Sequence, residues 1–215
     1  MGAKVKGAGS NTIVISGVKK LHDVNHKVIA DRIEAGTYLC MVAATQGKAD
    51  LINVNSEHIS AITHKLKRIG LKIKSEKNLI NIENTGKLLS TTIKTSPYPG
   101  FPTDMQSQIA ALLTIAKGTS IIVENIFENR FKYVNELIRM GANINVEGKT
   151  AIIQGVPKLY GTEVETKDLR GGAALILSGL IADGVTKISG VNYVERGYEN
   201  LIEKLSIIGA KIYKE

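Results

Sequence analysis

Arg139-Met140-Gly141-Ala142-Asn143-Ile144 decides the fold, because its pattern occurs at two other places in the chain. The other copies are Arg68-Ile69-Gly70-Leu71-Lys72-Ile73 and Ile207-Ile208-Gly209-Ala210-Lys211-Ile212, at nearly equal spacing. In each copy a leucine lies four residues before the glycine, in a segment whose apolar residues have helical spacing. A motif that recurs at this period indicates one supersecondary unit used three times.

Each unit is predicted to contain a helix, a strand, a second helix and two further strands. The first helices are expected to start at Asp31, Asp104 and Asp168. Each should end at a glycine before a β-branched segment, because glycine enters the left-handed region without a Cβ penalty. These glycines are Gly47, Gly118 and Gly184. The chain is therefore expected to form an α/β lobe of three βαβαββ-type repeats with pseudo-threefold symmetry.

The ends of the chain suggest how the lobe is closed. The opening Met1-Gly2-Ala3-Lys4-Val5 looks like the end of a repeat without its helix, so an N-terminal lobe is expected to be missing. The last repeat lacks a final strand, and we expect residues 12–15 to supply it beside residues 211–212. The predicted single lobe then has repeats at about 19–83, 84–156 and 157–215 plus 1–18.

Composition limits the class of protein. A hydrophobic fraction of 43% is enough for a core, and 5% aromatic residues without Trp make that core aliphatic. No apolar run reaches the roughly 18 residues of a membrane helix, and no signal peptide is visible. One Cys excludes an internal disulfide and favours the cytoplasm. The net charge of +8 favours an anionic partner, but no aromatic residues are interleaved with the lysines as nucleic-acid binding would require.

A stiff loop precedes the second repeat's first helix. Residues 96–106 contain three of the four prolines, each of which fixes φ. Asp104, at the end of this loop, has two interpretations. Either Thr103 or Asp104 caps the helix, or Asp104 is a catalytic base. The helix N-termini of the three repeats should come together at one end of the lobe, together with Arg32 and Arg170. An end of this kind binds anions and keeps an aspartate ionised.

Five motifs in order resemble the UDP-N-acetylglucosamine 1-carboxyvinyltransferase family of enolpyruvyl transferases. The resemblance covers essentially the whole chain. The motifs are Pro-Gly-Phe-Pro-Thr-Asp-Met-Gln at 99–106, Glu-Asn-Arg-Phe at 128–131, Arg-Met-Gly-Ala at 139–142, Asp-Leu-Arg at 168–170 and Arg-Gly-Tyr-Glu at 196–199.

The resemblance implies a fold and a reaction. The family has two lobes, each an inside-out α/β barrel of three repeats, and this chain resembles the C-terminal lobe. The implied reaction adds the 3-hydroxyl of UDP-N-acetylglucosamine to C2 of phosphoenolpyruvate and expels phosphate, which opens peptidoglycan synthesis without a cofactor or a metal. The chain alone is expected to be inactive. A truncated paralogue or an isolated binding lobe without catalysis is the alternative.

The resemblance also assigns residues. It implies that Asp104 is the base at the sugar hydroxyl and that Arg196 binds phosphoenolpyruvate, for which a guanidinium fork is suited. Ile126 is expected to contact the nucleotide-sugar with Arg130 nearby. Asp168 and Arg170 are expected to line the cleft, with Asp31 in a matching place.

Simpler roles compete with several of these assignments. Arg196 could form a surface ion pair, Asp168 and Arg170 could pair locally, and Ile126 could be core. Cys40 lies in an apolar helical segment and is expected to be inert. His22 and His26 have helical spacing without a third ligand, so no metal site is expected.

Overall fold

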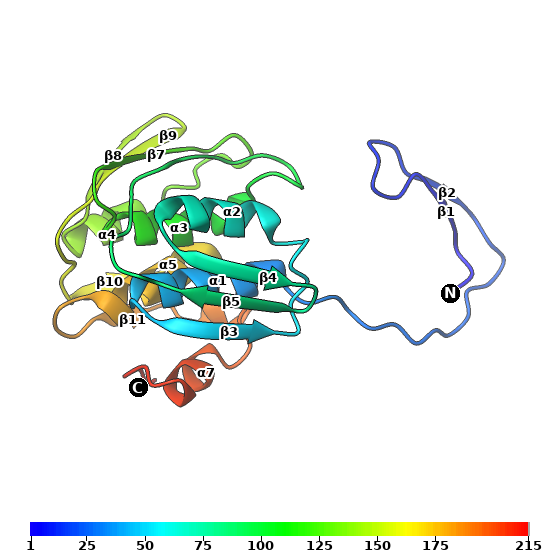
Figure 1. Ribbon diagram of the computed structural model, residues 1–215. Coiled ribbons are helices and arrows are strands. Elements are labelled where there is room, and N and C mark those ends of the chain that lie inside the picture. The colour runs from blue at the N-terminus through cyan, green and yellow to red at the C-terminus, as the bar shows by residue number, and fades with distance from the viewer. Residues whose placement is uncertain (215) are drawn as a thin grey trace.

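Three buried helices form the centre of the molecule in the computed structural model, which describes residues 1–214 (Figure 1). They are α1 (Arg32–Ala44), α3 (Gln106–Leu113) and α5 (Leu169–Ile181), the first helices of the three repeats. All eight residues of α3 are buried. Close packing depends on small residues, since a Cβ on Gly36 of α1 would lie 2.8 Å from the sulfur of Met105. The apolar helices are inside and the sheets outside, which is the inside-out α/β arrangement.

The sheets surround this centre. In the first repeat β3 (Lys48–Ile52), β5 (Leu79–Glu83) and β4 (Lys72–Glu76) pair antiparallel in that order. The second sheet has the order β6 (Thr92–Lys94), β7 (Thr119–Val123), β9 (Thr150–Gln154), β8 (Asn143–Glu147), with only β6 and β7 parallel. The third contains parallel β10 (Glu163–Glu165) and β11 (Lys187–Ser189). Alternate residues of β5 and β9 point into the core, as period-two strands require.

The outer helices confirm the repeat. They are α2 (Ser60–Ile69), α4 (Val134–Arg139), α6 (Asn192–Glu195) and α7 (Leu201–Ile207). Gly70, Gly141 and Gly209 follow α2, α4 and α7 with φ of 115°, 94° and 101°, so each copy of the motif ends its helix in the left-handed region. After α1, however, the left-handed residue is Gln46 and not Gly47. The short strands β6 and β10, before the second and third central helices, were not predicted.

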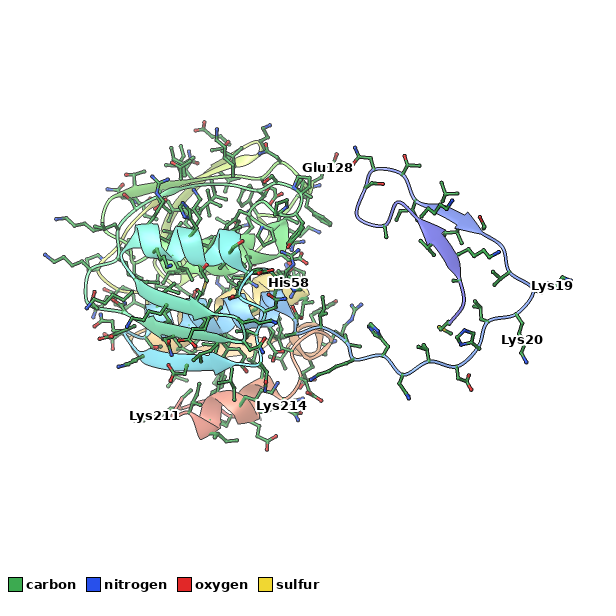
Figure 2. All side chains as sticks on the ribbon, turned by 45° about the vertical axis from the view of Figure 1, so that its right-hand side comes forward. Lys19, Lys20, His58, Glu128, Lys211 and Lys214 are labelled. Carbon is green, nitrogen blue, oxygen red and sulfur yellow. The ribbon has the colours of Figure 1, made fainter. Side chains whose placement is uncertain are left out.

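The expected closure of the lobe by residues 12–15 is wrong. The strand β2 (Val14–Ser16) pairs antiparallel with β1 (Lys4–Lys6), and residues 210–214 contain no strand. The β1–β2 hairpin stands away from the body on an extended, exposed segment that bends near Lys19 and Lys20 (Figures 1 and 2). A hairpin joins residues close in sequence, so its closure costs far less chain entropy than joining the two ends. The single-lobe boundaries stay a prediction.

Candidate functional site

The three aspartates predicted at helix starts divide into two kinds. Asp31 accepts hydrogen bonds from the backbone N–H groups of Ile33 (2.7 Å) and Glu34 (3.2 Å), and so caps α1. Asp168 caps α5 in the same way, through the N–H groups of Arg170 (3.0 Å) and Gly171 (2.8 Å). Both carboxylates therefore satisfy free helix N–H groups, which is the usual role of an aspartate at a helix start.

Asp104 does not cap a helix. It lies in η1 (Thr103–Met105), a 3₁₀ turn without a side-chain cap, and α3 starts two residues later than predicted. The turn is closed by the N–H of Met105 on the carbonyl of Pro102. The carboxylate of Asp104 instead accepts hydrogen bonds from Arg130 Nη2 at 2.7 Å and from Arg170 Nη2 at 3.1 Å. Two arginines from different repeats thus hold one carboxylate between them.

The two guanidinium groups decide the charge of Asp104. Partial burial alone would raise its pKa, but the charges of Arg170 and Arg130 and their hydrogen bonds outweigh burial and lower it below its ordinary value. The side chain of Asp104 is still 43% exposed, whereas those of Arg130 and Arg170 are 13% and 15% exposed. The site therefore exposes the Asp104 carboxylate beside two largely buried guanidinium groups. A competing anion could displace this carboxylate from either arginine.

The lowered pKa predicts a pH dependence of stability. A carboxyl whose pKa is lower in the folded state stabilises the fold fully above its unfolded pKa of about 3.9, and loses that contribution as pH falls through the folded value. We expect wild type to exceed Asp104→Asn in free energy of unfolding near pH 6, and the difference to shrink as the pH falls to about 3. Urea unfolding at several pH values measures it. A constant difference would contradict the ion-pair assignment.

Glu124, directly after β7, was not predicted and organises the loops of the site. Only 4% of it is exposed, and its carboxylate accepts four hydrogen bonds. The donors are Thr95 Oγ1 (2.7 Å), Thr103 Oγ1 (2.9 Å) and the N–H groups of Ile126 (2.9 Å) and Phe127 (3.0 Å). Glu124 thereby joins the turn that holds Asp104 to the loop that leads to Arg130. No local motif marks it, because its partners come from three separate segments.

Replacement of Glu124 should therefore be costly. Glu124→Leu leaves two hydroxyl protons and two N–H groups without an acceptor in a buried place, so we expect a loss of unfolding free energy on the order of 3 kcal/mol or more. Glu124→Gln keeps an acceptor for three of the donors and should lose about 1 kcal/mol. Chemical denaturation of the chain compares them, and equal losses would show that the hydrogen bonds are unimportant.

The other predicted residues lie at different distances from this cluster of Asp104, Arg130 and Arg170. Ile126 is 45% exposed, so its side chain is not part of the core. Phe127 lies next to it, with its ring centroid 4.9 Å from Cζ of Arg130. Arg196 is exposed at the end of α6 and forms no ion pair within residues 1–214. The surface ion pair, which was the alternative role for Arg196, is thus not found in the described chain, and the structure does not place Arg196 in the cluster.

The glycines after Asp-Leu-Arg have a packing role. A Cβ on Gly172 would lie 2.3 Å from a methyl group of Val194 and 2.7 Å from Thr166 Oγ1. Gly197 has a similar constraint, because its Cβ would lie 2.7 Å from a methyl group of Leu169. These glycines let the segment with Arg196 lie directly against α5.

The single cysteine takes no part in the site. Cys40 is completely buried, and burial raises its pKa to about 12, so the thiol is inert as predicted. In the described part of the chain, no three metal-ligating side chains come together, and no helix is long and apolar enough to span a membrane.

A groove lies beside the cluster and not at it. It has a volume of about 1090 Å³ between α2 and β6, and shares Pro99 and Phe101 with the loop before Asp104. Its lining carries basic side chains and no acidic one; Lys65 reaches across to the carbonyl of Thr92 at 2.8 Å. The basic residues are His64, Lys65, Lys67, Arg68 and Lys94.

Comparisons with known proteins define the class. A family model described as EPSP synthase (3-phosphoshikimate 1-carboxyvinyltransferase) matches residues 1–205. The crystal structure of the enolpyruvyl transferase NikO from Streptomyces tendae is 27% identical, with a TM-score of 0.83 over 99% of this chain and 51% of that one. EPSP synthase from Acinetobacter baumannii shares the fold, with a TM-score of 0.65 over 88% of this chain and 44% of its own, at 17% identity. The chain therefore belongs to the enolpyruvyl transferase family.

The curated relatives show which branch of the family this chain belongs to. UDP-N-acetylglucosamine 1-carboxyvinyltransferase 1 of Caldanaerobacter subterraneus is 52% identical over all of this chain and 52% of its own length. The enzyme of that name from Thermotoga petrophila is 50% identical over 99% of this chain and 50% of its own. One from Desulfofundulus thermocisternus is 50% identical over all of this chain and 88% of its own. The chain belongs to this branch, and it spans about half the length of the first relatives.

Proposed function

We propose that this chain is one half of an enzyme that transfers the enolpyruvyl group of phosphoenolpyruvate to the 3-hydroxyl of UDP-N-acetylglucosamine. The observation that carries this proposal is the Asp104 carboxylate between Arg130 and Arg170, beside the N-terminal ends of α3 and α5. The proposal further implies a cytoplasmic role in the first committed step of peptidoglycan synthesis.

The cluster suits this chemistry. Asp104 would accept the proton of the sugar hydroxyl as the hydroxyl oxygen bonds to C2 of phosphoenolpyruvate. The C2=C3 double bond opens in this step, and C3 takes a proton from an acid of the proposed second lobe. Loss of a proton from C3 then expels phosphate and leaves the enolpyruvyl ether. Phosphoenolpyruvate carries a phosphate and a carboxylate, both of which compete with Asp104 for guanidinium groups. Binding would therefore weaken the ion pairs that hold the pKa of Asp104 low, and make the carboxylate a better base.

The remaining residues are assigned supporting roles. Exposed Arg196 is proposed to bind phosphoenolpyruvate, since it has no competing ion pair in the described chain. Exposed Ile126 and neighbouring Arg130 are proposed to contact the nucleotide-sugar. Asp168, by capping the helix that carries Arg170, and Asp31 are proposed to shape the cleft.

A second lobe, joined in the same chain or supplied separately, is the proposed partner. The side chain of Asp104 is 43% exposed. The β1–β2 hairpin stands away from the body (Figure 1), and its apolar residues Val5, Val14 and Ile15 are exposed. Apolar strand residues exposed in this way are typical of an unpaired interface. We propose no nucleic-acid or membrane partner.

The acceptor specificity tests the proposal. The first lobe of a relative is fused to this chain, and phosphate release from phosphoenolpyruvate is measured with UDP-N-acetylglucosamine or with 3-phosphoshikimate. Turnover with the nucleotide-sugar alone is expected. Turnover with 3-phosphoshikimate alone would overturn the assigned acceptor. A correctly folded fusion without turnover would favour the alternative, a non-catalytic half of the enzyme, which the half-length match also permits.

A further inference from the structure

The hydroxyl of Tyr198 lies where the three central helices meet. Tyr198 is the largest completely buried side chain of the core, with 1% exposed. Its hydroxyl oxygen is 2.9 Å from Thr37 Oγ1 of α1, 3.1 Å from Gln108 Nε2 of α3 and 3.4 Å from Arg170 Nη1 of α5. One atom thus contacts one polar side chain from each repeat.

The directions of these hydrogen bonds follow from the groups present. Thr37 donates its proton to the carbonyl of Ile33 at 2.8 Å, so it accepts the proton of Tyr198. The two lone pairs of the Tyr198 oxygen are then free for Gln108 and Arg170, which can only donate through these nitrogens. The proton and both lone pairs of the phenol are used, and a buried network with every member satisfied is rigid.

Arg170 is consequently held at both ends of its guanidinium. Nη1 donates to Tyr198 and Nη2 donates to Asp104 at 3.1 Å, while Cζ lies 5.9 Å from the centroid of the tyrosine ring. Arg130 is held less firmly, because Nη2 bonds Asp104 whereas its buried Nε has no partner within residues 1–214. The two arginines on Asp104 therefore differ. The guanidinium of Arg170 is hydrogen-bonded to both the core and the carboxylate, whereas that of Arg130 is hydrogen-bonded to the carboxylate and lies against the exposed ring of Phe127.

We propose that Tyr198 is a positioning residue, whose hydroxyl fixes Arg170 and, through Arg170, the Asp104 carboxylate against the three-helix centre. The fixing of Arg170 by Tyr198 is a property of the ligand-free chain. Only the expected effect of Tyr198 on catalysis rests on the proposed function. The Arg-Gly-Tyr-Glu motif then has a second role beside that proposed for Arg196.

Arginine side-chain NMR of the ¹⁵N-labelled chain tests the proposal. A guanidinium held at both Nη atoms rotates slowly about its Nε–Cζ bond, the rotation that exchanges Nη1 with Nη2, and therefore gives separate Nη signals. We expect separate signals for Arg170 in wild type, and averaged signals in Tyr198→Phe, which removes only the hydroxyl. Tyr38→Phe is the matched control, because the buried Tyr38 hydroxyl has no hydrogen-bond partner in the described chain; it should leave the Arg170 signals separate.

Two results would overturn the proposal. One is separate Arg170 signals that persist in a folded Tyr198→Phe chain. The other is averaging of the Arg170 signals in wild type, as in exposed side chains. This second result needs no variant, so it can be obtained even if Tyr198→Phe does not fold. In a two-lobe fusion, Tyr198→Phe should also lower kcat by ten- to a hundredfold, on the order expected for a misplaced catalytic group. Absence of turnover in the wild-type fusion would contradict the proposed function and leave the NMR result intact.

Discussion

Residues 1–215, purified alone, should release phosphate from phosphoenolpyruvate and UDP-N-acetylglucosamine no faster than buffer. The reason is geometric: transfer requires both substrates to be held and desolvated between two surfaces, and a closed site supplies much of the rate through orientation and exclusion of water. Here Asp104 is 43% exposed and Arg196 is exposed, so water would solvate the reacting groups on this side. A continuous phosphate assay measures the rate.

The control for this first result is the same chain with the first lobe of a relative fused or added. Turnover should rise from background by orders of magnitude, because the second surface restores the closed site. Turnover of the isolated chain at a rate typical of enzymes, roughly 1 s⁻¹ or more, would contradict the expectation. It would also show that one surface is enough to orient both substrates.

The repeat could be predicted because its signals are local. A glycine in the left-handed region ends a helix through the backbone of a few adjacent residues, so Gly70, Gly141 and Gly209 reveal the unit from sequence alone. Strand pairing between the ends of the chain is not local, and that prediction failed. The β1–β2 hairpin satisfies the same backbone groups through a short connection, which sequence repetition cannot exclude.

The site could be predicted in part for the same reason. Family motifs identified Asp104, Arg130 and Arg170, and the structure brings these three together. Glu124 and Tyr198 were missed because their hydrogen bonds join segments distant in sequence. The sequence did not show whether Asp104 is a helix cap or an ion-paired carboxylate. The answer depends on the turn after Pro102, which moves the start of α3 by two residues.

Asp104→Asn in a two-lobe fusion should reduce kcat by a hundred- to ten-thousandfold, about the range for loss of a general base. Asparagine keeps the shape of the side chain but cannot accept the proton of the sugar hydroxyl. It also leaves Arg130 and Arg170 facing each other without an anion between them, so the melting temperature should fall slightly. Steady-state kinetics with each substrate varied, together with thermal unfolding, measure both effects.

The kinetic constants separate the two roles that the ion pairs permit. If Asp104 is the base, the loss appears in kcat, while KM for phosphoenolpyruvate stays the same or falls because two guanidinium groups are released to bind it. If Asp104 only holds the arginines in place, KM for phosphoenolpyruvate rises and kcat changes little. Asp183→Asn is the matched control, since it removes an exposed ion pair with Lys158 and should leave both constants unchanged. Nearly full kcat in Asp104→Asn would assign the proton transfer to another group.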